Sequence, residues 1–207
     1  MSKLKKLAIV DVDGTITDFY KVDHEIIPEI YHNKLVLFLD KLLWKLNSLD
    51  IITNSYSLFK LRMSIYSILS LHNIKKDIAK YKSEYIKYAN GYFKNFLQNE
   101  YKLLKNKGYD ILILTSDPFD SYMDRRVTVS QDKVRYVEDN VPSKYNEVCV
   151  IGNNFSDDIL SGIKLREKFN IKVHICYIGK SPIIKRRLKN KEVNFCSCLK
   201  DAIKQIK

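Results

Sequence analysis

The amino-acid sequence predicts an α/β protein, a doubly wound parallel sheet with an inserted helical segment. Short apolar runs alternate with amphipathic segments along the chain, which is typical of parallel strands joined by helices. Polar and acidic residues follow several of the apolar runs, at the edge where open parallel sheets bind ligands. The chain has 207 residues, enough for one core domain and a sizeable insertion but not for two independent large domains.

Four apolar runs are expected to form strands, and their ranges are 6–11, 110–115, 147–151 and 172–178. The amphipathic segments are expected to form helices near 95–107, 133–140, 156–168 and 182–190, with a last helix from 198. This alternation places helices on both faces of the sheet.

Residues 1–18 and 100–207 are expected to form the core, and residues 19–99 an inserted helical domain. The insertion shows no strand alternation but several helical periods. These periods are Leu35, Leu39, Leu42, Leu43 and Leu46, then Leu58, Leu61, Ile65, Ile68 and Leu69, then Tyr81, Tyr85, Tyr88, Tyr92 and Phe96. The aromatic period lies on one helix face, where we expect a packed stripe between helices. A substrate-facing or dimer-forming surface is the alternative, which leaves a homodimer open.

Two carboxylates follow the first apolar run, in the sequence IVDVDGT of residues 9–15. Asp11 and Asp13 are one residue apart, so an extended strand end turns both toward the same face. Two like charges this close are most easily tolerated with a cation between them. Such oxygen ligands suit Mg²⁺, and one carboxylate can attack phosphorus while the other handles protons. A polar strand end that caps a following helix is the alternative interpretation of the D-x-D pair alone.

Further residues suited to phosphate chemistry follow the later strands. The apolar run 111–114 ends in Thr115 and Ser116. A hydroxyl at a strand end donates to a phosphate oxygen, as do the N–H groups of a following helix start. Lys133 opens the segment that leads to the next strand and suits the neutralisation of charge on a transferring phosphoryl group. Lys144 is the rival lysine, because it lies nearer that strand in the sequence.

An acidic segment, GNNFSDD at residues 152–158, follows the strand expected at 147–151. Together with the three preceding pieces it resembles the motifs of the haloacid dehalogenase-like (HAD) phosphohydrolase superfamily, over residues 5–20 and 100–180. The resemblance implies a Rossmannoid core and a Mg²⁺-dependent phosphatase that works through an aspartyl-phosphate.

The resemblance also implies a role for each matching residue. Asp11 is expected to attack phosphorus, and Asp13 to protonate the leaving alcohol and then activate water. Thr115, Ser116 and Lys133 are expected to bind the phosphoryl oxygens.

The fourth motif departs from the family pattern at its first position, where Asn153 replaces the usual Asp. The metal ligands that the resemblance implies are therefore Asp11, the backbone carbonyl of Asp13, and Asn153, whose neutral amide oxygen removes one charge. Asp157 stands behind them, and Asp158 less surely; these acids are expected to hold metal-bound waters or to orient Lys133. An inactive descendant is the alternative that this departure raises.

The insertion resembles the helical cap of the phosphoserine phosphatase-like branch, which closes over the catalytic face, excludes water and selects the substrate. Phosphoserine phosphatase itself carries a Glu where this chain has Tyr20, and its segment corresponding to residues 115–133 is longer. The nearby acids Asp18, Asp23 and Glu25 make an amine-bearing substrate plausible.

The expected substrate is a small phosphorylated metabolite: a phosphorylated amino acid, amino alcohol, sugar or a conjugate of these, including a precursor of a surface polysaccharide. Two other functions stay open. One is a non-catalytic HAD-fold binding protein, in which Asn153 marks a decayed metal site. The other is a nucleic-acid end-processing phosphatase, indicated only by the basic composition.

The composition fits a globular protein, with 45% hydrophobic and 29% charged residues and a net charge of +12. The lysines are spread along the chain rather than gathered into one arm, so a nucleic-acid partner is not expected. No apolar stretch approaches the ~20 residues that span a bilayer, so no membrane partner is expected either. No signal peptide is expected, and the four cysteines match no zinc spacing, which favours reduced thiols in the cytoplasm.

Overall fold

The described residues, 5–48, 56–117 and 124–206 of this computed structural model, contain one parallel sheet. Its six strands follow the order β3-β2-β1-β4-β5-β6, and each neighbouring pair is parallel. The strands are β1 (Lys6–Val10), β2 (Tyr109–Thr115), β3 (Val127–Val129), β4 (Glu147–Gly152), β5 (Lys172–Tyr177) and β6 (Asn194–Phe195). The predicted α/β class with a parallel sheet is confirmed.

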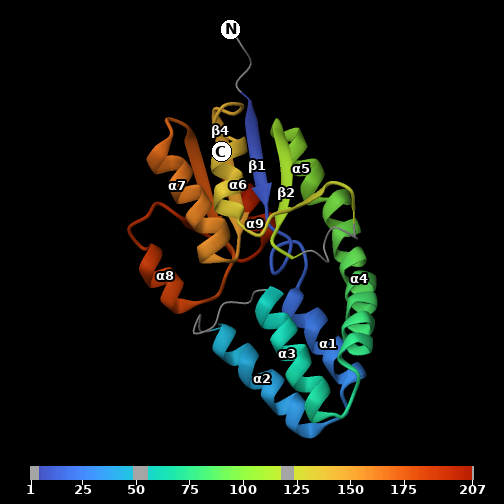
Figure 1. The fold of residues 1–207 in the computed structure, drawn as a ribbon. Coiled ribbons are helices and arrows are strands. Elements are labelled where there is room, and N and C mark those ends of the chain that lie inside the picture. The colour runs from blue at the N-terminus through green and yellow to red at the C-terminus, as the bar shows by residue number, and fades with distance from the viewer. Residues whose placement is uncertain (1–4, 49–55, 118–123, 207) are drawn as a thin grey trace.

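Helices lie between β1 and β2, between β3 and β4, between β4 and β5, and between β5 and β6 (Figure 1). Between β1 and β2 the chain forms α1 (Phe19–Ile30), α2 (Lys34–Ser48), α3 (Tyr56–Leu69), α4 (Ile74–Gln98) and α5 (Glu100–Asn106). The later helices are α6 (Lys133–Asn140), the π-helical turn η2 (Phe155–Ile159), α7 (Leu160–Lys168), α8 (Pro182–Leu188) and α9 (Leu199–Gln205). No helix in the described ranges is both long and apolar enough to cross a membrane.

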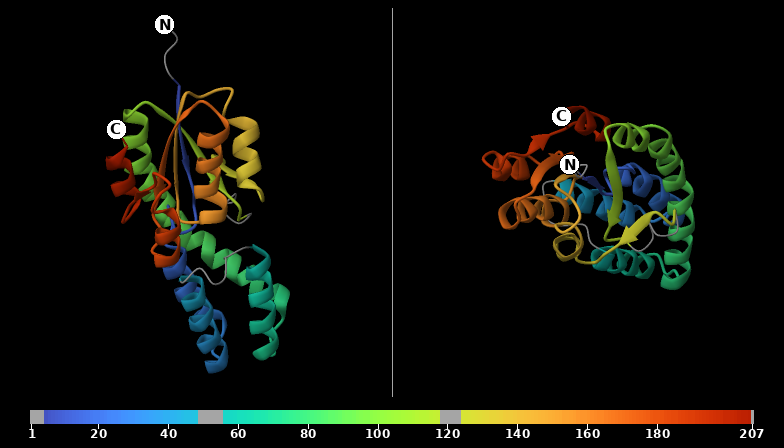
Figure 2. Two further views of the ribbon diagram at one scale, coloured as in Figure 1. Left: turned by 90° about the vertical axis from the view of Figure 1, so that its left-hand side faces the viewer. Right: turned by 90° about the horizontal axis from the view of Figure 1, so that it is seen from above.

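Both faces of the sheet are buried. Because successive side chains alternate across a strand, Ala8 and Val10 enter one hydrophobic cluster while Leu7 and Ile9 enter another. Helices α5 and α9 and the end of α4 cover the first face, and α6, α7 and α8 cover the second (Figure 2). Burial on both faces explains why the strands appear in the sequence as continuous apolar runs.

The strand order reverses at β1. From β1 the chain proceeds outward to β2 and β3, and then crosses back to β4 on the other side of β1. Val10 of β1 is paired with Ile113 of β2 and with Ile151 of β4. The residues that follow these three strands therefore meet at one edge, and open parallel sheets bind ligands at such a reversal.

All four strands expected from the sequence are present, but β3 and β6 were missed. They are three and two residues long, too short to show a period. The single helix expected over 95–107 is wrong, because Asn99 leaves the helical backbone (φ −114°, ψ −81°) and separates α4 from α5. The helix expected over 156–168 begins as a π-helical turn.

Helices α1 to α4 pack around a hydrophobic cluster of their own, and we call the described residues from Phe19 to Ala89 the helical unit. The helical unit lies beyond the carboxyl ends of the strands (Figure 1). Helix α4 connects it to the core: Tyr81 and Tyr85 belong to the cluster of the helical unit, whereas Phe93 and its neighbours join the cluster of the sheet. The aromatic period of α4 is thus largely a packed stripe, as expected.

Candidate functional site

A tight turn follows β1 and holds the first carboxylate of the D-x-D pair. The N–H groups of residues 15–17 donate to the carbonyl of Val12, which folds the chain back directly after Asp11. Gly14 has a φ of 76°, a conformation that glycine adopts without strain. A Cβ at Gly14 would also overlap the Asn153 amide, so the turn after β1 and the loop after β4 touch at this point.

Lys133 connects two carboxylates at the floor of the site. Asp132 caps the amino end of α6, and Lys133 at the first position of that helix points back toward the strand ends. Its Nζ donates to Oδ1 of Asp11 at 2.5 Å and to Oδ1 of Asp158 at 2.8 Å. Lys133 is only 4% exposed. Gly152 makes room for this arrangement, because a Cβ there would overlap the Asp158 side chain.

The rival lysine lies elsewhere. Lys144 is exposed in the turn after α6, where its N–H donates to the carbonyl of Val141, and it does not line the pocket described below. The structure therefore brings Lys133, and not Lys144, to the D-x-D pair.

The second carboxylate of the pair is held by side chains from two different elements. The hydroxyl of Tyr85, on α4, donates to Oδ1 of Asp13 at 2.6 Å, and the hydroxyl of Thr17 donates to the same oxygen at 3.3 Å. Tyr85 is 1% exposed. Sequence reasoning missed this residue as part of the site, since the only signal was its place in the aromatic period.

Thr115 and Ser116 lie at the end of β2, beside the D-x-D turn. Thr115 is buried, and its Oγ1 accepts a hydrogen bond of 3.0 Å from the N–H of Asp117. The carbonyl of Ser116 accepts from the side-chain amide of Gln131, which ties the end of β2 to the segment before α6. Thr115, Ser116 and Asp117 all line the pocket.

The acidic segment after β4 divides its side chains between two places. Asn153 and Asp157 line the pocket, while Asp158 is buried against Lys133. Asn154 caps η2 by accepting from the N–H of Ser156, and its own N–H donates to Oδ2 of Asp158 at 3.1 Å. The unusual turn thus fixes Asp158 as the partner of the lysine and leaves Asp157 facing the pocket.

Burial shapes the electrostatics of the site. It raises the pKa of Asp11 to about 7, helped by the negative charge of Asp158 and opposed by Lys133. It also raises the pKa of Asp13, with the charge of Asp117 as the next cause. Burial alone would lower the pKa of Lys133, but the attraction of Asp11 and Asp158 outweighs it and raises this pKa above its ordinary value. Carboxylates therefore crowd around a single buried lysine.

The side chains that line the pocket determine whether it suits a metal ion. Within the described ranges, no group of three or more His, Cys, Asp or Glu side chains is arranged to hold one. Among the residues that line the pocket, the carboxylates of Asp11 and Asp157 and the amide oxygen of Asn153 are oxygen ligands suited to a metal ion. Burial, and then the charge of Asp158, also raise the pKa of Asp157. Carboxylate and amide oxygens of this kind fit Mg²⁺.

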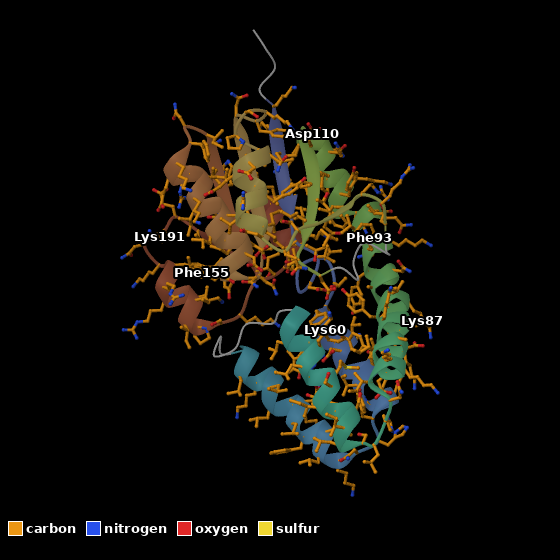
Figure 3. The ribbon with its side chains drawn as sticks, in the orientation of Figure 1. Lys60, Lys87, Phe93, Asp110, Phe155 and Lys191 are labelled. Atoms are coloured by element: carbon orange, nitrogen blue, oxygen red, sulfur yellow. The ribbon has the colours of Figure 1, made fainter. Side chains whose placement is uncertain are left out.

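The pocket lies between the strand ends and the helical unit and has a volume of about 840 Å³. Its floor is the D-x-D turn with Thr115 and Lys133, and its opposite wall comes from α1 and α2 through Tyr20, Lys41 and Trp44. In Figure 3, Lys60 marks the end of α3 that faces the core, and this end borders the same region. A small ligand beneath the helical unit would reach the carboxylates of the floor.

The acids proposed to hold a substrate amine are placed differently from one another. Asp23 is fully buried and accepts hydrogen bonds from Arg62, Trp44 and Tyr81, so it has a structural role in the helical unit. Asp18 caps the amino end of α1 and lines the pocket.

Comparison of the chain with protein-family models, with curated proteins and with solved structures found no match. The site brings together a buried carboxylate in contact with a lysine, a second carboxylate in contact with two hydroxyl groups, and the polar residues at the end of β2.

Proposed function

We propose that the protein is a Mg²⁺-dependent phosphomonoesterase of the HAD type, with residues 19–99 acting as a helical cap. The observation that supports this most directly is the contact of Lys133 with Asp11 on the floor of a pocket that Asp13 and Thr115 also line. A carboxylate, an acid–base partner and a cation at one edge of a parallel sheet suit phosphoryl transfer.

The first half-reaction forms the covalent intermediate. A carboxylate oxygen of Asp11 bonds to phosphorus while the bond from phosphorus to the substrate alcohol breaks. Asp13 gives its proton to the departing alcohol oxygen, and its pKa, raised by burial, keeps that proton available near neutral pH. Lys133 and the donors at Thr115 neutralise charge on the phosphoryl oxygens.

The second half-reaction restores the enzyme. Asp13 takes a proton from water, whose oxygen bonds to phosphorus as the bond to Asp11 breaks, and inorganic phosphate leaves. Mg²⁺, when bound, supplies positive charge against the phosphoryl oxygens, and Asp11, the backbone carbonyl of Asp13 and Asn153 would hold it, with Asp157 behind them. The helical unit limits access of bulk water to this chemistry.

The proposed substrate is a small phosphomonoester that fits beneath the helical unit. A pocket of about 840 Å³ is in the range of ligand sites for small molecules, which run from roughly 300 to 1,000 Å³. Because Asp23 is occupied by Arg62, recognition of a substrate amine by Asp23 has no support. Asp18, by contrast, lines the pocket.

Phosphatase assays on Asp11→Asn test the proposal. With a generic aryl phosphate in Mg²⁺, this variant should lose turnover by at least ~10³-fold, because an amide cannot form the intermediate. The matched control is Asp110→Asn, at the opposite end of β2 (Figure 3), which should keep wild-type turnover. Wild-type activity in Asp11→Asn would show that another group attacks phosphorus.

A second candidate function follows from Asn153, where an amide replaces the carboxylate expected in a catalytic site. It is a binding protein with this fold that carries out no turnover. A ligand that binds only the folded state raises the melting temperature. A titration that gives no shift at millimolar Mg²⁺, together with no phosphate release from any substrate in a panel, would favour this second function.

A further inference from the structure

Large apolar side chains are exposed mainly in one part of the molecule. Of the thirteen large hydrophobic residues exposed in the described ranges, eight lie between residues 35 and 71. They are Leu35, Phe38 and Leu42 on α2, Leu61, Ile65, Ile68 and Leu69 on α3, and Leu71 in the turn that follows. Scattered exposed apolar residues are ordinary, but a concentration of them marks a contact surface.

The exposed apolar residues lie on helices that also have a buried face. On α2, Val36 and Asp40 are buried toward the helical unit. Leu35, Phe38 and Leu42 are three and four residues apart, so they share one face of the helix, and that face points away from the buried one. Helix α3 is arranged in the same way, with Met63 and Tyr66 buried in the helical unit and Leu61, Ile65, Ile68 and Leu69 exposed. The core of the helical unit therefore leaves an outward apolar face on each of the two helices.

The start of α2 and the end of α3 meet at the end of the helical unit farthest from the sheet. The side-chain amide of Asn33, just before α2, donates to the carbonyl of Leu69, the last residue of α3, at 2.9 Å. This end projects away from the core (Figure 1). We call its apolar residues, Leu35, Phe38, Ile68, Leu69 and Leu71, the distal tip.

Leu71 is the most exposed residue of the distal tip. Its side chain is 95% exposed, and its φ of 57° lies in the left-handed region. Glycine or asparagine usually occupies this position at a helix end, because larger side chains are strained there. A leucine kept in a strained and exposed position contributes nothing to the core, which agrees with a role in contact.

The charges around the distal tip have one sign. Within the described residues from Tyr31 to Asp77, the exposed charged side chains are all lysines, and the two acids, Asp40 and Asp77, are buried. Lys34, Lys75 and Lys76 lie next to the distal tip in the sequence, whereas Lys41 and Lys45 line the pocket and Lys60 lies at the core-facing end of α3. An exposed acid does occur just before this range: Glu29, whose Oε1 accepts from Tyr88 of α4.

We propose that the distal tip binds the surface of a lipid bilayer that contains anionic lipids. Apolar side chains flanked by lysines are the composition that enters the boundary between head groups and acyl chains, while the lysines attract anionic head groups. A second copy of the chain fits less well, since a symmetric contact would bring Lys34, Lys75 and Lys76 toward their own counterparts. Binding at the surface needs no spanning segment, so the absence of a spanning run in the sequence does not bear on it.

Vesicle sedimentation tests the proposal. The full chain is mixed with vesicles of phosphatidylcholine alone and with vesicles that also contain phosphatidylserine. We expect the bound fraction to be at least ~10-fold larger on the anionic vesicles and to fall as salt screens the lysines. Inorganic phosphate at the concentration of the lipid phosphate should not compete, because the apolar residues require a bilayer and not a phosphate group.

Paired variants test whether vesicle binding depends on the distal tip or is nonspecific adsorption. Phe38→Gln, Ile68→Gln and Leu71→Gln combined should reduce binding to anionic vesicles by at least ~10-fold. Lys34→Gln, Lys75→Gln and Lys76→Gln combined should reduce it by about fivefold per lysine. The matched controls lie on the core: Leu103→Gln with Ile183→Gln for the apolar set, and Lys185→Gln, Arg186→Gln and Lys189→Gln for the charged set. Both control sets should bind as the wild type does.

Three results would overturn the proposal. The first is no binding to either kind of vesicle. The second is equal loss of binding in tip and control variants that still unfold cooperatively. The third is a dimer, measured by analytical ultracentrifugation, that the apolar tip variant converts to a monomer while vesicle binding is absent; a second copy would then cover the tip.

Discussion

The hydroxyl of Tyr85 donates a hydrogen bond of 2.6 Å to the carboxylate of Asp13, across 72 positions of the chain. Tyr85 belongs to the helical unit, whereas Asp13 stands at the end of β1. The contact therefore connects the proposed cap directly to the proposed acid–base residue. It also keeps the Asp13 side chain turned toward the pocket, which makes Tyr85 a positioning residue.

Tyr85→Phe should therefore weaken proton transfer more than phosphoryl binding. An alkyl phosphate needs a proton on its leaving oxygen, whereas a nitrophenyl phosphate does not. We expect kcat for the alkyl substrate to fall by ~10-fold or more and kcat for the nitrophenyl substrate to change by less than about threefold. Steady-state kinetics on the two substrates measure the difference. The control is Tyr88→Phe on the same helix, because the Tyr88 hydroxyl contacts Glu29 of α1 and Tyr88 does not line the pocket. An equal loss for both substrates would assign Tyr85 a purely structural role.

The two lysines considered for the phosphoryl group can be separated by one substitution each. Lys133→Met should reduce kcat by ~10²-fold or more, since it removes the cation that contacts Asp11. Lys144→Met should stay within about twofold of the wild type, because Lys144 is exposed outside the pocket. Turnover of an aryl phosphate gives both numbers, with circular dichroism as the check on folding. A large loss in Lys144→Met alone would reverse the assignment.

Asn153 offers a test of the metal site. Asn153→Asp adds a carboxylate to the pocket and should lower the Mg²⁺ concentration that gives half-maximal activity, while turnover can move either way as repulsion toward phosphate increases. Asn153→Ala should raise that concentration and leave the fold intact. Activity measured against Mg²⁺ concentration compares the three proteins. Identical dependence in all of them would mean that Asn153 is not a ligand.

Asp40 gives a prediction about stability and pH. Burial, and then the negative charge of Asp23, raise its pKa to about 6 in spite of Arg62. Between pH 4.5 and pH 6 the folded state thus binds a proton that the unfolded state has lost. The contribution of Asp40 to the free energy of unfolding therefore falls as the pH rises through 6. Asp40→Asn cannot ionise and keeps an acceptor for the Tyr66 hydroxyl.

Relative to the wild type, Asp40→Asn should gain about 2 kcal/mol of unfolding free energy between pH 4.5 and pH 7.5. Urea unfolding of both proteins at the two pH values measures this gain. Asp139→Asn, an exposed acid on α6, should show no such change. A constant difference between Asp40→Asn and the wild type at both pH values would contradict the raised pKa.

Residues next to one another in the sequence allowed much of the site to be predicted. Asp11 and Asp13 follow a buried strand, and Thr115 ends another, so a parallel sheet alone brings them to one edge. The rest depends on contacts between distant segments. Tyr85 reaches Asp13 only because α4 packs against α1, and Asp23 is removed from the pocket by Arg62, 39 positions away. No local period contains that information.

The helix α4 has a mechanical consequence for the molecule. Tyr85 and Ala89 are packed in the helical unit and Phe93 in the core, and between these anchors lies Gly91, whose surroundings are open. Glycine weakens a helix by about 1 kcal/mol relative to alanine and frees its backbone. If the mouth of the pocket widens to admit a substrate, α4 bends most easily at Gly91. Bending there would move Tyr85, together with the helical unit, away from Asp13.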